Sequence, residues 1–170
     1  MVKNQKWLKK FIADSRAREH ASDSMSIEEA MFSVFTETVS ASEVLPNIFY
    51  QKYSSTLKNR PYEIWGLQKS LQDDILEYSV FICDFNFSEE ISNALTNNIE
   101  SSIKRVSNFL EFTLSKSLRN NINDFHDIRY TVTDIIDCDE KYGIASLNIY
   151  YLTNKQIKNI DNLASQVVFK

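Results

Sequence analysis

The chain has 170 residues, of which 43% are hydrophobic and 12% are aromatic, so it is long and apolar enough to bury one core. Two glycines and two prolines exclude the glycine-rich loops that hold phosphates in P-loop and dinucleotide-binding proteins. Two cysteines without a histidine cluster exclude a disulfide framework and a zinc site, and a net charge of −4 does not indicate a strong non-specific nucleic-acid binder.

Apolar residues form no run that approaches the length of a membrane-spanning helix, and the N-terminus lacks the apolar core of a signal peptide. We therefore expect a cytoplasmic protein in a reducing compartment, without a membrane partner.

The first 59 residues predict helices. Residues 4–21 have the pattern of a basic amphipathic helix, which favours packing onto the domain over a role at a membrane surface. Ser26 and Glu29 form a capping box that begins a second helix, and Pro46 ends that helix at about residue 45. Residues 47–59 predict a short helix or a packed loop.

A β-hairpin is predicted next, with strands at 62–67 and 75–85 and an acidic turn at 70–74. The consecutive apolar residues 80–83 are typical of a strand that is buried on both faces, so the second strand should be central. Ser88 then has the character of a helix N-cap, with two glutamates in the first turn.

Residues 99–119 carry one continuous apolar stripe at helical spacing and predict the longest helix after the hairpin. Residues 124–136 fit a helix and also show some strand-like alternation, and we favour the helix. A loop at 137–143 and a strand at 144–152 follow, and residues 166–169 predict a last short strand.

Together these elements predict an α/β (α+β) fold. A small mixed sheet of about four strands is built on the central hairpin and flanked by helices, and the long helix permits a parallel crossover to the strand at 144–152. We expect a single domain over 1–170, with a helical part at 1–59 and a sheet-plus-helix core at 60–170.

Carboxylates are the remaining candidates for chemistry, because two or three acids at the open end of a sheet can hold Mg²⁺ for phosphodiester cleavage. Asp84 ends the central strand, Asp74 lies in the turn before it, and Glu37 or Glu43 lies on an earlier helix. Asp74 and Asp84 are therefore the candidate catalytic residues, and Glu37, Asp74 and Asp84 are the candidate metal ligands. Such sites usually include a lysine, and the residue two after Asp84 is an asparagine.

Several stretches resemble the N-terminal region of bacterial AIPR (abortive-infection phage-resistance) proteins over roughly residues 60–155. They are the hairpin, two parts of the long helix (108–111 and 114–118) and the strand that ends in Thr153-Asn154. The resemblance implies a restriction-endonuclease-like core in a defence protein much longer than this chain. It also implies that Asp84-Phe85-Asn86 occupies an Asp/Glu-x-Lys motif without its lysine, and that Trp65 stands where an acid is expected. Both departures imply a non-catalytic copy.

Our leading hypothesis is a non-catalytic nuclease-like domain of a bacterial phage-defence protein that acts in assembly, regulation or nucleic-acid sensing. It would use no cofactor, and its partners would be other domains of a longer protein, a second copy or nucleic acid. The chain would then be an N-terminal fragment or a shortened relative. Two alternatives are an active Mg²⁺-dependent endonuclease and a protein-interaction module unrelated to defence.

Overall fold

The computed structural model describes residues 2–40, 48–123 and 126–157. They fall into two compact units, each drawn from segments that are far apart in the sequence. The first unit takes residues 2–40, 83–100 and 152–157, and the second takes 48–82, 101–123 and 126–151. The single-domain organisation stays a prediction.

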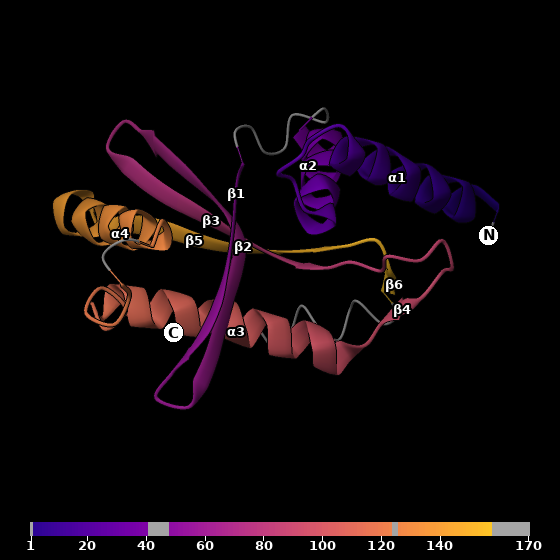
Figure 1. The fold of residues 1–170 in the computed structure, drawn as a ribbon. Helices are drawn as coiled ribbons and strands as arrows, with labels where there is room; N and C mark the ends of the chain where they lie inside the picture. The colour runs from indigo at the N-terminus through magenta and orange to yellow at the C-terminus, as the bar shows by residue number, and fades with distance from the viewer. Residues whose placement is uncertain (1, 41–47, 124–125, 158–170) are drawn as a thin grey trace. The chain divides into compact units, whose positions relative to one another are not determined.

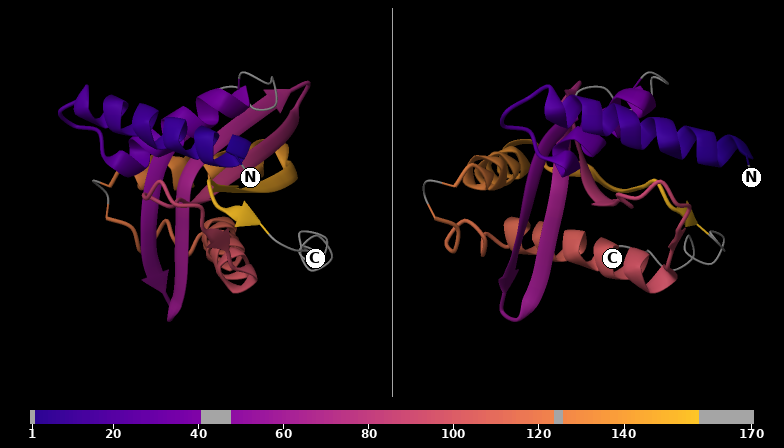
Figure 2. Two further views of the ribbon diagram at one scale, coloured as in Figure 1. Left: turned by 90° about the vertical axis from the view of Figure 1, so that its right-hand side faces the viewer. Right: turned by 45° about the vertical axis from the view of Figure 1, so that its right-hand side comes forward.

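Two helices make up most of the first unit, α1 (Val2–His20) and α2 (Ile27–Ser40), which lie side by side in Figures 1 and 2. Both were predicted, and the Ser26 hydroxyl accepts a hydrogen bond from the Glu29 backbone N–H at 3.2 Å, as the capping box requires. Their apolar faces pack around the Phe85 ring, whose centroid lies 5.9 Å from that of Phe11. The buried hydrophobic residues of the two helices are Leu8, Phe11, Ile12, Ala30, Met31 and Phe32.

The prediction that a helix begins at Ser88 is wrong. The Asn86 side chain closes a turn there instead, accepting from the Ser88 N–H at 3.1 Å and donating to the Glu90 carbonyl at 2.7 Å. Short polar side chains compete in this way with helical hydrogen bonds. A short strand follows, β4 (Asn93–Ala94), paired in parallel with β6 (Gln156–Ile157), and the next helix begins at Thr96.

The second unit contains most of a four-stranded sheet with the order β1-β2-β3-β5. Its strands are β1 (Phe49–Leu57), β2 (Arg60–Gln72), β3 (Ile75–Asp84) and β5 (Ile144–Thr153). The first three pair antiparallel in sequence order. Side-chain hydrogen bonds join Ser146 to Glu77 and Thr153 to Asp84, seven residues further along both strands, so β5 runs parallel to β3. The predicted mixed sheet on a central hairpin is confirmed.

The prediction of a short helix or a packed loop at 47–59 is wrong, because the strand β1 occupies most of this stretch. It is an edge strand whose residues are exposed or half-buried, so it lacks the apolar alternation that identifies a strand. Lys58 and Asn59 join it to β2 with φ of 51° and 60°, the left-handed geometry of a two-residue hairpin turn. The predicted strand at 166–169 lies outside the described residues.

Helices α3 (Thr96–Leu114) and α4 (Ile128–Tyr142) complete the described elements. The preference for a helix over a strand within 124–136 is confirmed for its described part from Ile128 onward. The loop predicted at 137–143 is wrong up to Tyr142, because α4 continues until Gly143 takes a φ of 71°. α3 ends earlier than predicted, before Lys116 at φ 60°. Val80, Phe81 and Ile82 are at most 1% exposed, which confirms that β3 is buried on both faces.

Candidate functional site

The three predicted metal ligands lie on different elements. Asp84 is the last residue of β3, Asp74 lies in the turn before that strand, and Glu37 lies on α2. Asp74 and Asp84 are ten positions apart, and at about 3.3 Å per residue β3 separates them by about 30 Å. This strand does not bring the two carboxylates together. Glu43, the alternative ligand to Glu37, is outside the described residues.

Glu37 takes part in an ion pair between the two N-terminal helices. Its two carboxylate oxygens accept hydrogen bonds from the Arg18 guanidinium at 2.6 and 2.7 Å, and Arg18 also donates to the Ser33 hydroxyl at 2.5 Å. The hydrogen bond from Arg18 holds the pKa of Glu37 below its ordinary value. The contact joins α1 to α2, which is a structural role for this carboxylate.

Asp84 is held by a lysine that sequence reasoning missed. The Lys155 amine donates a hydrogen bond to Asp84 Oδ1, and the two side chains are only 17% and 21% exposed. Lys155 follows β5 directly, and the carboxyl ends of neighbouring parallel strands meet at one edge of a sheet. An amine therefore reaches Asp84 from a position 71 residues downstream, although Asn86 is not a lysine. The polar residues that follow β5, the strand parallel to β3, are the sequence signal that could have identified Lys155.

The Asn154 side chain binds the backbone of Asn86 next to this ion pair. Asn154 accepts a hydrogen bond from the Asn86 backbone N–H at 2.7 Å and donates to the Asn86 carbonyl at 2.8 Å. The side-chain amide thus makes both hydrogen bonds that a paired strand would make. Thr153 Oγ1 adds a bond of 2.7 Å to the Asp84 carbonyl oxygen. These contacts fix the backbone on both sides of Asp84.

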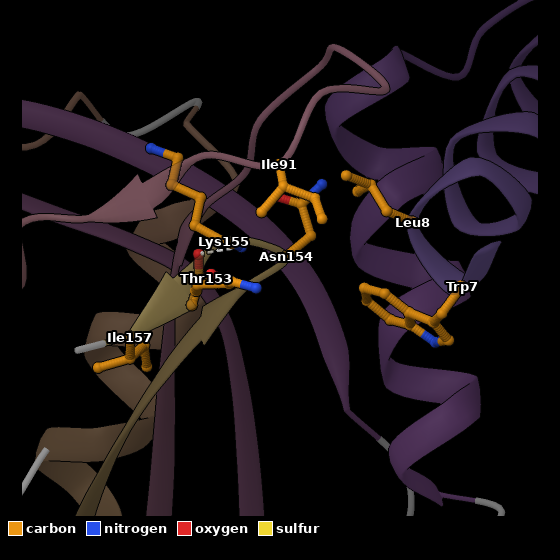
Figure 3. A pocket seen from close by; sticks show the side chains of 8 residues that line it. Trp7, Leu8, Ile91, Thr153, Asn154, Lys155 and Ile157 are labelled. Carbon is orange, nitrogen blue, oxygen red and sulfur yellow. Dashed lines mark hydrogen bonds between the residues drawn. The ribbon is translucent and has the colours of Figure 1, made fainter. Parts of the chain in front are cut away.

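A pocket of about 450 Å³ adjoins this network within the first unit. Apolar side chains from α1 and from the loop before β4 form part of its lining, and residues 153–157 form the rest (Figure 3). Trp7 is 43% exposed and stacks on Phe11 with 5.3 Å between ring centroids, so one face of its indole is supported by the core. In Figure 3 the Lys155 amine points away from Trp7, which agrees with its bond to Asp84. The pocket combines an aromatic surface with hydroxyl and amide groups.

The residues around Asp84 do not fit a magnesium ion. Mg²⁺ needs several oxygen ligands, with carboxylates to balance its charge. Among the described residues, no three His, Cys, Asp or Glu side chains gather where they could hold a metal ion. The ammonium group of Lys155 on Asp84 would also repel a cation. The ligand set of Glu37, Asp74 and Asp84 stays a prediction from the sequence.

Trp65, which stands where the resemblance implied an acid, is a core residue at 5% exposure. Its indole N–H donates to the Glu63 carboxylate at 2.8 Å, and the Lys52 amine lies 4.2 Å from the centre of its ring. Cys83 is buried, as expected for a small core side chain.

None of the described helices is long and apolar enough to cross a membrane.

Comparison with protein families gives one clear match. Residues 31–169 match the family model described as Abortive infection phage resistance protein N-terminal domain. Searches of curated proteins and of solved structures find no match.

Proposed function

The chain belongs to the abortive infection phage resistance protein N-terminal domain family, which associates it with phage defence. From this premise we propose that it acts as a non-catalytic, nuclease-like domain of a bacterial cytoplasmic defence protein. Its role would be nucleic-acid sensing, regulation, or assembly with other domains of a longer protein.

The ion pair between Asp84 and Lys155 is the observation that supports a non-catalytic role. A metal-dependent nuclease needs a carboxylate that is available to a metal ion, and here the carboxylate at the end of the central strand binds an amine. The neighbouring asparagines and Thr153 fix the backbone around it. Such an arrangement joins the ends of β3 and β5.

A cleavage assay tests this proposal. The purified chain is incubated with Mg²⁺ or Mn²⁺ and with plasmid DNA, single-stranded DNA or RNA. We expect no cleavage of any substrate and no difference between the wild type and Asp84→Ala. Cleavage that needs the metal, is lost in Asp84→Ala and persists in Glu89→Ala would overturn the proposal, since Glu89 is an exposed acid outside the network.

An active endonuclease is the second candidate, and the observation that favours it is that a lysine lies beside an acid at the end of β3. Nuclease sites of this kind combine acids with a lysine, and Lys155 places an amine beside Asp84 where the local sequence lacks one. In this case Lys155→Ala and Asp84→Ala would each abolish metal-dependent cleavage. An inactive wild-type chain would remove the support for this candidate.

A further inference from the structure

A basic pocket lies in the second unit, and none of its lining residues belongs to the network around Asp84. It has a volume of about 210 Å³ and lies between α3 and the turn that joins β1 to β2. α3 crosses the β1–β2 hairpin close to this turn (Figure 1). Its lining residues are Asn59, Arg60, Pro61, Ser101, Lys104, Arg105 and Asn108. Among the described residues, this lining includes three cations and no carboxylate.

One face of α3 supplies the helical wall. Ser101, Lys104, Arg105 and Asn108 follow the spacing i, i+3, i+4 and i+7, which places them together on one side of a helix. Two cations, an amide and a hydroxyl therefore point to the same space. All three kinds of group donate hydrogen bonds to phosphate oxygens.

Both arginines are held in place by acids outside the pocket lining. Arg60 makes a bidentate ion pair with Glu111 at 2.6 and 2.7 Å, and Arg105 pairs with Glu63 at 2.6 Å. The buried Asn108 accepts a further hydrogen bond from Arg60 and donates to the Pro61 carbonyl at 2.7 Å. A guanidinium group has five N–H donors, so each arginine is oriented and keeps donors for a ligand.

Lys104 adds a third cation to the pocket lining. It is exposed and makes no hydrogen bond or ion pair with any residue that the structure describes. Lys58, in the turn beside Arg60, is exposed as well. Four cations and the two paired acids leave this surface with two net positive charges, in a chain whose total charge is −4.

We propose that this pocket binds a backbone phosphate of nucleic acid. The inference rests on the sensing role proposed above and gives that role a site. Its ligand contacts come from Arg60, Lys104 and Arg105, whose N–H groups donate to phosphate oxygens, and a phosphate contact carries no direct information about base sequence. Binding is therefore independent of base sequence and weakens as salt is raised.

Fluorescence anisotropy with labelled single-stranded DNA, RNA and duplex DNA of several sequences tests the proposal at several salt concentrations. Lys104→Ala should weaken binding about three- to tenfold and lower the slope of log affinity against log salt by about one. The matched control is Lys9→Ala, which removes an exposed lysine on α1. It should leave the affinity and the salt slope unchanged. Glu111→Gln removes an acid beside the pocket and should strengthen binding about two- to threefold.

Equal effects of Lys104→Ala and Lys9→Ala would overturn the proposal, and so would the absence of binding to every nucleic acid. Inorganic phosphate is added as a competitor. Binding of inorganic phosphate alone, with no affinity for oligonucleotides, would also overturn the assignment to nucleic acid. Failure here is distinct from failure of the non-catalytic proposal, because the cleavage assay depends on Asp84 and this one on Lys104.

Discussion

The Asp84 carboxylate and the Lys155 amine are both shielded from most of the solvent, which makes their ion pair worth more than one at the surface. Removing one partner leaves a shielded charge with its main counter-charge lost. Such losses cost more than the pair itself contributes, because desolvation of the remaining charge is not compensated.

Lys155→Ala should therefore lower the free energy of unfolding by about 2 kcal/mol. The double variant Asp84→Asn/Lys155→Met should lose less than Lys155→Ala alone, since it removes both charges. Urea denaturation measures both values. The comparison variant is Lys116→Ala, whose ion pair with Glu140 is more than half exposed at both side chains and should matter little. A change below about 0.5 kcal/mol for Lys155→Ala would contradict a structural role for the pair.

Glu37 makes a pH-dependent contribution to the stability of the fold, and the sign of this contribution follows from the direction of its pKa shift. Arg18 lowers the pKa of Glu37 in the folded state, so the ion pair stabilises the fold above the ordinary carboxyl range and the effect disappears as pH falls through the lowered pKa. The side chain is 63% exposed, so solvent screens the interaction and keeps it below about 1 kcal/mol.

Glu37→Gln should therefore have a lower unfolding midpoint than the wild type near neutral pH, and this difference should shrink at an acidic pH. Thermal unfolding of both proteins at the two pH values tests this. A difference that grows on acidification would show that the assigned direction of the pKa shift is incorrect.

At the scale of elements, the two hairpins of the sheet use the same kind of turn. Asp73 and Asp74 have φ of 50° and 63°, as Lys58 and Asn59 have in the first hairpin. Two consecutive left-handed residues match the twist of the flanking strands, and glycine takes this conformation with the least strain. An acid at Asp74 is thus compatible with a turn and needs no catalytic explanation.

Asp74→Gly should raise the stability of the hairpin by about 0.5–1 kcal/mol, and Asp74→Val should lower it by about 1–2 kcal/mol because branched side chains resist positive φ. Thermal melting of the two variants measures the difference. Asp74→Gly also removes a predicted catalytic carboxylate. Destabilisation by this variant would mean that the Asp74 side chain makes a contribution that the turn geometry does not explain.

For the whole molecule, each compact unit contains one tryptophan. Trp7 belongs to the first unit and is half-exposed, while Trp65 belongs to the second and is buried. Trp65→Phe leaves Trp7 as the only reporter, and Trp7→Phe leaves Trp65. Fluorescence of the two variants in urea therefore follows the two units separately.

Phe32 is 1% exposed in the core of the first unit, and Phe32→Ala should cost about 3–5 kcal/mol there. We expect it to lower the unfolding midpoint reported by Trp7 more than the midpoint reported by Trp65, as sub-global unfolding allows. Phe109→Ala, in the core of the second unit, is the reciprocal control. Equal shifts at both reporters would show that the two units unfold as one.

Elements whose signal is local could be predicted from the order of residues alone. The hydrophobic period of α3, the capping box at Ser26 and the unbroken apolar run in β3 each depend on neighbours within a few residues, and all three were predicted. The mixed sheet on a central hairpin followed from the order of those elements.

Contacts between residues that are distant in the sequence depend on how the strands pair in the folded chain. β1 is an edge strand with mostly exposed side chains, so its identity depends on pairing with β2 and not on its own pattern. The partner of Asp84 depends on β5 lying parallel to β3, because that arrangement brings Lys155 across 71 positions. Composition records how many charges a chain has, and strand pairing decides which of them neutralise one another.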